Sequence, residues 1–181
     1  MQDFSNWTLE TIRNDKSQLS WMEERRYDWT PLISSSLNTL LSGVTYIIIT
    51  DKEREWFGKY IIEMLNRPSK NRPLLPFYSF KSIFNSGMQQ LKTREGLLIL
   101  QDLLSISFSK GYRYFYIGSS SNPKASLAKG KDDSLMWIMD EPLPNSFHLE
   151  TNDDLLDIKL IQLARLFDKS IDSALLGEVK L

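Results

Sequence analysis

Residues 44–50, with the sequence Val-Thr-Tyr-Ile-Ile-Ile-Thr, constrain the fold of this chain more than any other stretch. The run is almost entirely apolar or β-branched. A strand with one solvent-exposed face would alternate apolar and polar residues, so this run predicts a strand buried on both faces. Such strands are typical of parallel sheets that lie between two layers of helices.

The segment that follows the strand predicts a tight turn and then a helix. Residues 52–67 have helical periodicity, and Thr50 with Glu53 fits a capping box at the helix start. In an open α/β sheet the ligand site lies beyond the carboxyl ends of the strands. This turn lacks glycine, and Asp51, Glu53 and Glu55 place negative charge at the helix N-terminus, which disfavours a bound anion.

Length and composition set the broad class. A chain of 181 residues fits one α/β domain, residues 1–181, with a core that needs no metal or disulfide. With 22 basic and 23 acidic residues, no global field draws the chain to nucleic acid. No apolar run reaches the roughly 20 residues that span a bilayer. The absence of cysteine excludes thiolate nucleophiles and cysteine zinc sites, and the cytoplasm is the expected compartment.

Alternating helix and strand patterns continue along the chain. They predict helices in 3–20, 21–43, 94–108 and 153–176, a short helix ending near residue 128, and further strands in 74–78, 112–117, 135–139 and 147–149. This order implies a three-layer αβα fold with a mainly parallel, five-stranded, flavodoxin-like sheet. Pro76 predicts an edge position for its strand, because proline cannot donate to the ladder. Residues 80–91 remain undecided between helix and strand.

Two helix boundaries are predicted from local signals. Either Thr30 caps a new helix with Pro31 at its first position, or one long helix is kinked at Pro31. Gly43 is a helix stop in both interpretations. At the C-terminal helix, residues 151–154 form a second capping-box match.

The last helix carries more apolar residues than one helix face needs. Its main stripe is Leu156, Leu160, Leu163, Phe167 and Ile171; further apolar residues off this stripe are Leu155, Ile158, Ile161, Leu166 and Leu175. Two interpretations stay open: a wide stripe beneath the chain's own N-terminal helices, or a surface for a subunit or partner.

Candidate chemistry is sparse. His148 is the only histidine; it is suited to act as a general base, yet no nucleophile motif accompanies it, which favours a structural role. Ser119, Ser120 and Ser121 lie in a turn between a strand and a helix, where hydroxyls and amides can hold a phosphate, as Ser/Thr-rich loops of sugar-isomerase (SIS) domains do. Pro123 removes one amide donor, and a capped turn without a ligand is the competing interpretation.

Two tryptophans carry different expectations. Trp137 lies in a predicted strand and is expected in the core. Trp56, beside Arg54 in the first crossover helix, is a candidate interface anchor, because Trp and Arg are enriched among binding hot spots. Core packing is the alternative for Trp56.

Several short segments, in order along nearly the whole chain, resemble the HobA family of the Helicobacter and Campylobacter group. They are residues 20–23, 54–57 with 60–61, 72–75, 154–168 and the ending 178–181. The resemblance implies a SIS-like fold without enzymatic activity, cofactor or metal, similar in role to DiaA. It further implies a homotetramer that binds the N-terminal domain of the initiator DnaA and promotes DnaA assembly at the chromosomal origin, without contacting nucleic acid or membrane.

The resemblance also suggests that the end of the last helix contacts the partner, at Ile171, Asp172 and Leu175. Arg54 and Trp56 join this set on hot-spot chemistry alone. The alternative function is a phosphosugar-binding isomerase or sensor of the SIS class, which would use the 119–121 turn.

Overall fold

The central sheet contains five parallel strands. The computed structural model describes residues 1–16, 18–84 and 93–181. The strands are β2 (Thr45–Thr50), β3 (Phe77–Ser79), β4 (Tyr112–Gly118), β5 (Leu135–Ile138) and β6 (Phe147–His148), in the spatial order β3-β2-β4-β5-β6. This is the flavodoxin-like order, and all five strands that the sequence predicts are confirmed.

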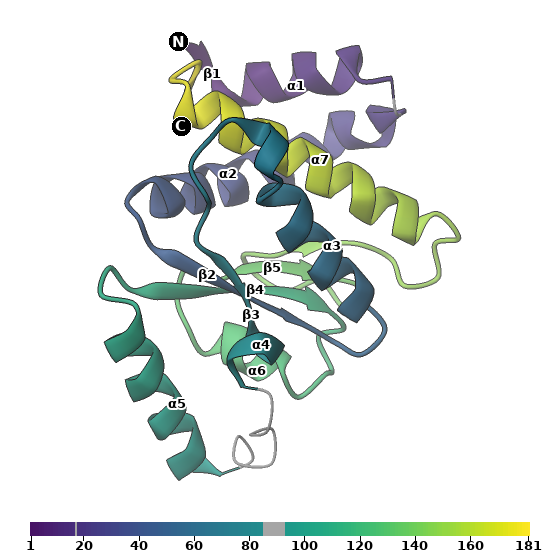
Figure 1. Ribbon diagram of the computed structural model, residues 1–181. Helices are drawn as coiled ribbons and strands as arrows, with labels where there is room; N and C mark the ends of the chain where they lie inside the picture. The colour runs from purple at the N-terminus through teal and green to yellow at the C-terminus, as the bar shows by residue number, and fades with distance from the viewer. Residues whose placement is uncertain (17, 85–92) are drawn as a thin grey trace.

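Helices cover both faces of the sheet (Figure 1). One layer holds α1 (Phe4–Asn14), α2 (Met22–Leu41), α3 (Glu55–Leu65) and α7 (Leu156–Leu175). The other holds α4 (Phe80–Ile83), α5 (Arg94–Ser107) and α6 (Ala125–Lys129). The three-layer αβα fold is therefore confirmed. Residues 80–83, undecided from the sequence, form α4, and residues 85–92 lie outside the described part of the chain.

The pleat of β2 explains the apolar run from which the fold was predicted. Tyr46 and Ile48 point into the core beneath α2, α3 and α7, whereas Ile47 and Ile49 point into the core beneath α4, α5 and α6. All four side chains are buried. Because successive residues of a strand face opposite sides, only an uninterrupted apolar run satisfies both cores.

Strand β3 lies at an edge of the sheet, as Pro76 predicts. It begins at Phe77, three residues later than expected, and Leu74 is 79% exposed. The carbonyl of Pro76 still accepts the Tyr46 amide at 2.9 Å. Pro76 therefore donates no hydrogen bond to the sheet, but its carbonyl oxygen still accepts one from β2.

A single helix α2 runs through Pro31, so the one-helix interpretation is correct. Trp29, Ile33 and Leu37 bury one face of it in the core, and this packing offsets the loss of a backbone donor inside the helix. The helix ends at Leu41, and Gly43 follows it in a left-handed conformation, φ +89°, with its amide donating to the Leu40 carbonyl at 2.9 Å.

Both predicted capping boxes are wrong. Helix α3 starts at Glu55, and Asp51 accepts the Arg54 amide at 3.0 Å in place of a Thr50 cap. At α7, Thr151 donates instead to the Met139 carbonyl, and the helix starts at Leu156. At α3 a different local hydrogen bond, three residues along the chain, replaces the predicted cap, whereas at α7 a contact with the end of β5 takes the Thr151 hydroxyl.

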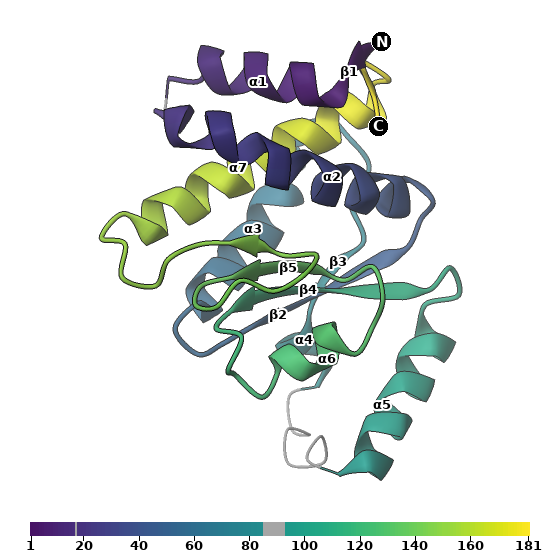
Figure 2. The ribbon, with the colours of Figure 1, turned by 180° about the vertical axis from the view of Figure 1, so that it is seen from behind.

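The two ends of the chain lie together (Figures 1 and 2). Strand β1 (Gln2–Asp3) pairs in parallel with β7 (Val179–Lys180) beside α1 and the end of α7. Short 3-10 helices at Leu19–Trp21 and Pro68–Lys70 complete the described elements. None of the helices in these described ranges is long and apolar enough to cross a membrane.

Candidate functional site

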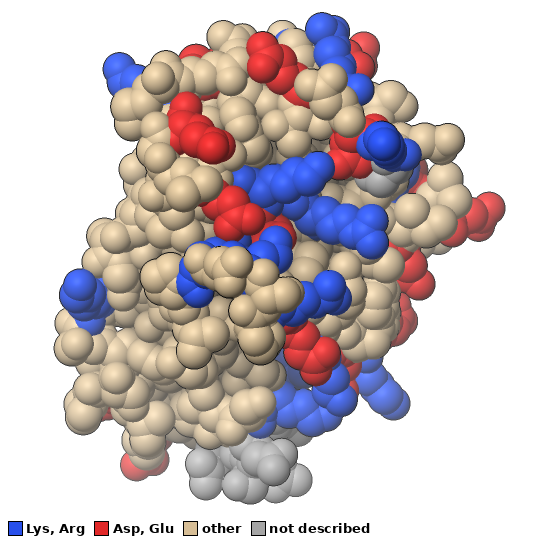
Figure 3. Space-filling view, turned by 45° about the horizontal axis from the view of Figure 1, so that its top comes forward, with Lys and Arg blue, Asp and Glu red and all other residues tan. Residues whose placement is uncertain are grey.

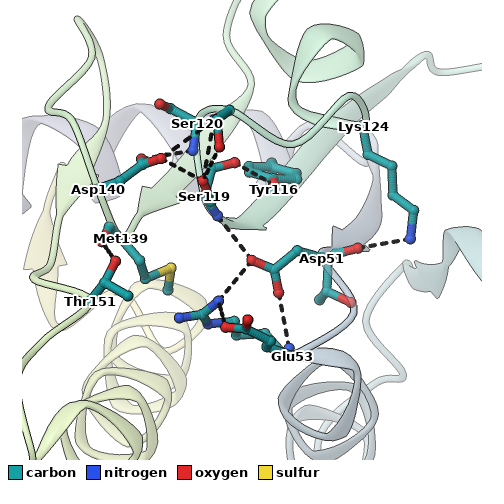
Figure 4. A network of polar contacts seen from close by, with 12 residues as sticks. Asp51, Glu53, Tyr116, Ser119, Ser120, Lys124, Met139, Asp140 and Thr151 are labelled. Atoms are coloured by element: carbon teal, nitrogen blue, oxygen red, sulfur yellow. Dashed lines mark hydrogen bonds and ion pairs between the residues drawn. The ribbon is translucent and has the colours of Figure 1, made fainter.

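The switch point of the sheet lies between β2 and β4, because the chain leaves β2 toward β3 on one side and returns to β4 on the other. In open α/β sheets this crevice is the usual ligand site. Here three strands end in polar groups: Asp51 follows β2, Ser119 follows β4 and Asp140 follows β5 (Figure 4). A phosphate bound at the serine turn would lie among these polar groups, so their charges and hydrogen bonds bear on the phosphate-binding alternative.

Asp51 lies at the centre of the crevice and is only 4% exposed. Its Oδ2 accepts hydrogen bonds from the Ser119 amide at 2.9 Å and from Arg54 Nη1 at 3.0 Å. A Cβ atom on Gly118 would lie 2.6 Å from the same oxygen. Glycine at position 118, at φ +154°, is thus what lets the carboxylate approach the end of β4 so closely.

Asp140 holds the serine turn from the other side (Figure 4). It accepts the Ser119 hydroxyl at 2.5 Å, the Ser120 amide at 2.7 Å and the Ser121 amide at 3.4 Å. Partial burial raises the pKa of Asp140, but these hydrogen bonds together lower the pKa to about 2. The carboxylate is therefore ionised wherever the protein works near neutral pH.

The free amides that a phosphate would need are thus already bonded to two carboxylates of the chain itself. Ser119 donates to both Asp51 and Asp140, and Ser120 and Ser121 donate to Asp140. A phosphate approaching this turn would meet negative charge and no free donor from these amides. The geometry is that of a capped turn, which is the competing interpretation of the serine sequence.

The remaining polar groups around the turn also hold the backbone. Tyr116 donates its hydroxyl to the Ser119 carbonyl at 2.7 Å, and burial raises the pKa of this phenol. Lys124 donates to the Thr50 carbonyl at 3.0 Å. A ring nitrogen of His148 contacts the Asp140 carbonyl at 2.5 Å, consistent with the structural role favoured for it.

A second polar cluster joins the loop after α3 to the outer side of α7. Arg72 and Asp168 are both 8% exposed at their side chains and pair at 2.6 Å. Lys70 also pairs with Asp168, and Asp172 pairs with Arg72. Figure 3, which looks onto the side of α1, α3 and α7, shows basic side chains gathered around acidic ones at the centre of this face.

Comparison with known proteins decides the family. A family model described as "HobA: DNA replication regulator" matches residues 1–181, the whole chain. This chain belongs to the HobA family. The DNA replication regulator protein HobA of Helicobacter pylori (strain ATCC 700392 / 26695) is 28% identical over 188 residues, and the alignment covers all of both chains.

Solved HobA structures share the fold. A crystal structure of a HobA–DnaA (domain I–II) complex from Helicobacter pylori matches with a TM-score of 0.76 at 27% identity, over 100% of each chain. A crystal structure of Helicobacter pylori HobA matches with the same TM-score at 26% identity, over 100% of this chain and 99% of the other. The family resemblance noted in the sequence is confirmed.

In this HobA-family chain, the predicted contact residues at the end of α7 differ in exposure. Ile171 is fully buried in the core, so its side chain cannot reach a partner. Asp172 has 37% of its side chain exposed and is held by Arg72. Leu175 is 41% exposed. Of the three, Leu175 offers an exposed apolar surface, and Asp172 offers a partly exposed carboxylate that already pairs with Arg72 and Lys70.

Trp56 and Arg54, the two candidates at the first crossover helix, also differ in exposure. Trp56 is 40% exposed, and its ring packs edge-on against the core residue Phe57 at 5.5 Å, as an anchored surface aromatic does. Arg54 is 8% exposed and its guanidinium pairs with Asp51 and Glu53. Arg54 therefore pairs with the buried Asp51 at the crevice, and of these two residues only Trp56 is exposed to solvent. Trp137 lies in the core, as expected.

The apolar residues off the main stripe of α7 divide between the two interpretations. Leu166 is buried against the other helices of its layer, as the intramolecular interpretation predicts. Leu155 and Ile158 are each 53% exposed at the start of the helix. Most of α7 is thus covered by the chain itself, and its two ends remain open.

The central roles of Asp51 and Asp140 are not among the predictions from the sequence, which assigns Asp51 only a negative charge at a helix start. The signal was present, because each aspartate directly follows a predicted buried strand and carboxyl ends of parallel strands meet at one edge. The ion cluster of Arg72 and Asp168 has no comparable signal, since 95 residues of chain separate its members.

Proposed function

We propose that this protein is a non-enzymatic regulator of replication initiation that binds the N-terminal part of the initiator DnaA. The observation that carries the proposal is the full-length match to HobA of Helicobacter pylori, a protein crystallised as a HobA–DnaA (domain I–II) complex. The match spans every element of the fold rather than one motif. The protein would act in the cytoplasm, where DnaA assembles on the chromosome.

We further propose that it works as a homotetramer. A symmetric oligomer presents several equal sites and so raises the local concentration of bound DnaA without contacting DNA. The near-zero net charge supports a protein that binds DnaA without contacting DNA, because binding to DNA phosphates depends on a basic surface. The switch-point crevice supports a non-enzymatic role, because Asp51 and Asp140 already accept hydrogen bonds from the amides that a phosphosugar would need.

For the contact with DnaA we propose two exposed residues, Trp56 at the start of α3 and Leu175 at the end of α7, together with Asp172 near Leu175 on α7. The Trp56 ring contacts Phe57 and is 40% exposed, and tryptophan is enriched among hot-spot residues. Leu175, 41% exposed at the end of α7, adds apolar surface on the helical layer that also holds α3.

The test is titration of the purified protein with DnaA domain I–II by calorimetry, with light scattering after size exclusion to report stoichiometry. Trp56→Ala and Leu175→Ala should each weaken binding by at least about tenfold, the loss of one hot-spot contact. Tyr27→Ala, which removes an aromatic side chain that is 66% exposed on α2, is the matched control and should bind normally. Failure of the wild type to bind would refute the proposal; wild-type binding by both variants would refute the surface.

The alternative SIS-class function has a direct test of its own. Saturation of a site at 100 times its dissociation constant stabilises a protein by about 2.7 kcal/mol. A panel of phosphosugars should therefore leave the melting temperature unchanged if the crevice is closed by its own carboxylates. A clear upward shift with one compound would favour the alternative.

A further inference from the structure

A cavity of about 230 Å³ lies at the carboxyl ends of β2 and β3, beside the crevice described above. It is bounded by the first turns of α3, by the short helix α4 and by Lys124, which precedes α6. Lys124 donates to the Thr50 carbonyl at 3.0 Å, and Figure 4 shows this lysine across Asp51 from Asp140. The described residues that line the cavity include none of the serine turn, so the carboxylates that close the turn leave this space open.

The inner wall of the cavity is apolar. Ile48 and Ile49 of β2 and Phe80 and Phe84 of α4 line it, and the first three of these side chains are buried. The two phenylalanine rings pack at 5.1 Å between centroids. A ligand with an apolar body would remove this wall from water, which favours binding.

The rim of the cavity is cationic. It holds the three lysines Lys59, Lys81 and Lys124 and one carboxylate, Glu55. Glu55 accepts a hydrogen bond from Lys81 at 3.0 Å. This bond lowers the pKa of Glu55, and the charges of Lys81, Lys124 and Lys59 lower it further. All three ammonium groups therefore act on the same small region, where they outnumber the carboxylate.

The other acidic residues at the start of α3 do not cancel this charge. Asp51 and Glu53 both pair with Arg54, on the side of the serine turn. Within the part of the chain that the structure describes, Lys59 and Lys124 form no ion pair. The expectation that negative charge at this helix start disfavours an anion therefore applies to the turn, whereas the cavity keeps two cations without a counter-charge.

We infer that this cavity binds a small anion with an apolar body, of the class of aromatic carboxylates and aryl phosphates. The anionic group would lie near Lys59 and Lys124, and the ring would lie against Ile49 and Phe80. A lysine ammonium pairs with a carboxylate or a phosphate as a point charge, so the rim accepts either group. The volume is below the roughly 300 Å³ of drug-sized sites, which suits a metabolite-sized molecule. A phosphosugar has a hydroxylated body and would leave the apolar wall without a partner.

The test is calorimetric titration of the full chain with phenylacetate and with phenyl phosphate, which share a ring and differ in the anionic group. A ligand of about ten non-hydrogen atoms should bind with a dissociation constant on the order of 1 mM. Benzyl alcohol, a ring without charge, and inorganic phosphate, a charge without a ring, should each bind at least about tenfold more weakly. The tighter of the two aromatic probes identifies the preferred anionic group.

Three variants locate the bound probe. Lys59→Glu reverses one charge of the rim and should weaken both aromatic anions at least about tenfold. Ser79→Leu fills the cavity and should block both; the Ser79 side chain makes no capping hydrogen bond to α4, so its loss costs little. Lys110→Glu is the matched control, because it makes the same charge change at an exposed position before the amino end of β4, and it should bind as the wild type does.

Weakened binding in Lys59→Glu and Ser79→Leu, with wild-type affinity in Lys110→Glu, supports the site. Absence of binding by the wild type at about tenfold the expected dissociation constant overturns it. Equal weakening in both lysine variants, or inorganic phosphate that binds as tightly as phenyl phosphate, overturns it as well. If Ser79→Leu does not fold, the two lysine variants decide the question, because both positions are exposed. DnaA enters none of these measurements, so the inference and the proposed function can fail separately.

Discussion

Replacing Asp140 with asparagine tests the account of the switch-point crevice. The substitution keeps the size and one acceptor oxygen of the side chain but removes the negative charge. It also places an amide donor where Ser119, Ser120 and Ser121 now donate to the carboxylate. The variant therefore probes whether the turn is held by the ionised carboxylate.

The magnitude follows from the pKa of the carboxyl group. Its pKa falls from 3.8 to about 2 in the folded protein, and one pKa unit corresponds to about 1.4 kcal/mol. Ionised Asp140 thus contributes at most about 2 kcal/mol, an upper value because the side chain is partly exposed and water screens it. A pKa lowered on folding stabilises the protein above the unfolded value near 4, and this stabilisation is lost as the pH falls toward 2.

The assay is urea unfolding followed by tryptophan fluorescence, at several pH values between 7 and 3. The wild type should exceed Asp140→Asn by up to about 2 kcal/mol at pH 7, and the difference should shrink steadily below pH 4. Asp132→Asn, an exposed aspartate in the loop before β5, is the control and should show little change. A difference that is absent at pH 7, or that is equally large at pH 3, would refute the reasoning.

Three further substitutions follow from the same contacts. Gly118→Ala would place a methyl group 2.6 Å from Asp51 Oδ2, and should cost at least about 2 kcal/mol in the same unfolding assay; a neutral effect would show that the carboxylate moves freely. Arg72→Ala removes one of the two cations that pair with buried Asp168, leaving Lys70, and should cost about 1.5–3 kcal/mol, with Arg72→Lys recovering part of it; equal loss in both variants would assign the effect to packing instead. Ile171→Ala should lower stability by about 2–5 kcal/mol through a core cavity while DnaA affinity of the folded fraction is kept, and a selective affinity loss would contradict its burial.

The sequence by itself determined the sheet and its layers. The run at residues 44–50 had to be a strand buried on both sides, because no other element accommodates consecutive β-branched apolar residues between two cores. Pro76 fixed an edge strand and Gly43 a helix end, since each acts through its own backbone dihedral and donor. The family resemblance was readable as well, because short matches in the right order survive 28% identity.

Only the structure shows which hydrogen bonds form where the sequence pattern at a helix start allows more than one. The patterns at 50–53 and 151–154 fit capping boxes, yet Asp51 accepts the Arg54 amide in place of Thr50, and Thr151 donates to the Met139 carbonyl. An N-cap is worth about 1 kcal/mol, so one competing hydrogen bond is enough to displace it. Arg54 is a second case: the sequence predicts a contact residue for DnaA, but in the fold its side chain is buried and pairs with Asp51.

Exposure was the property that the sequence could not supply. Ile171, Leu166 and Ile106 are equivalent apolar residues in helical patterns, but the first two lie in the core and the third is 84% exposed. Periodicity shows that a helix has an apolar side; which side meets the protein and which meets solvent depends on neighbours distant in sequence. For the same reason the closed crevice of Asp51 and Asp140, and the lysine-rimmed cavity beside it, became visible only in the folded chain.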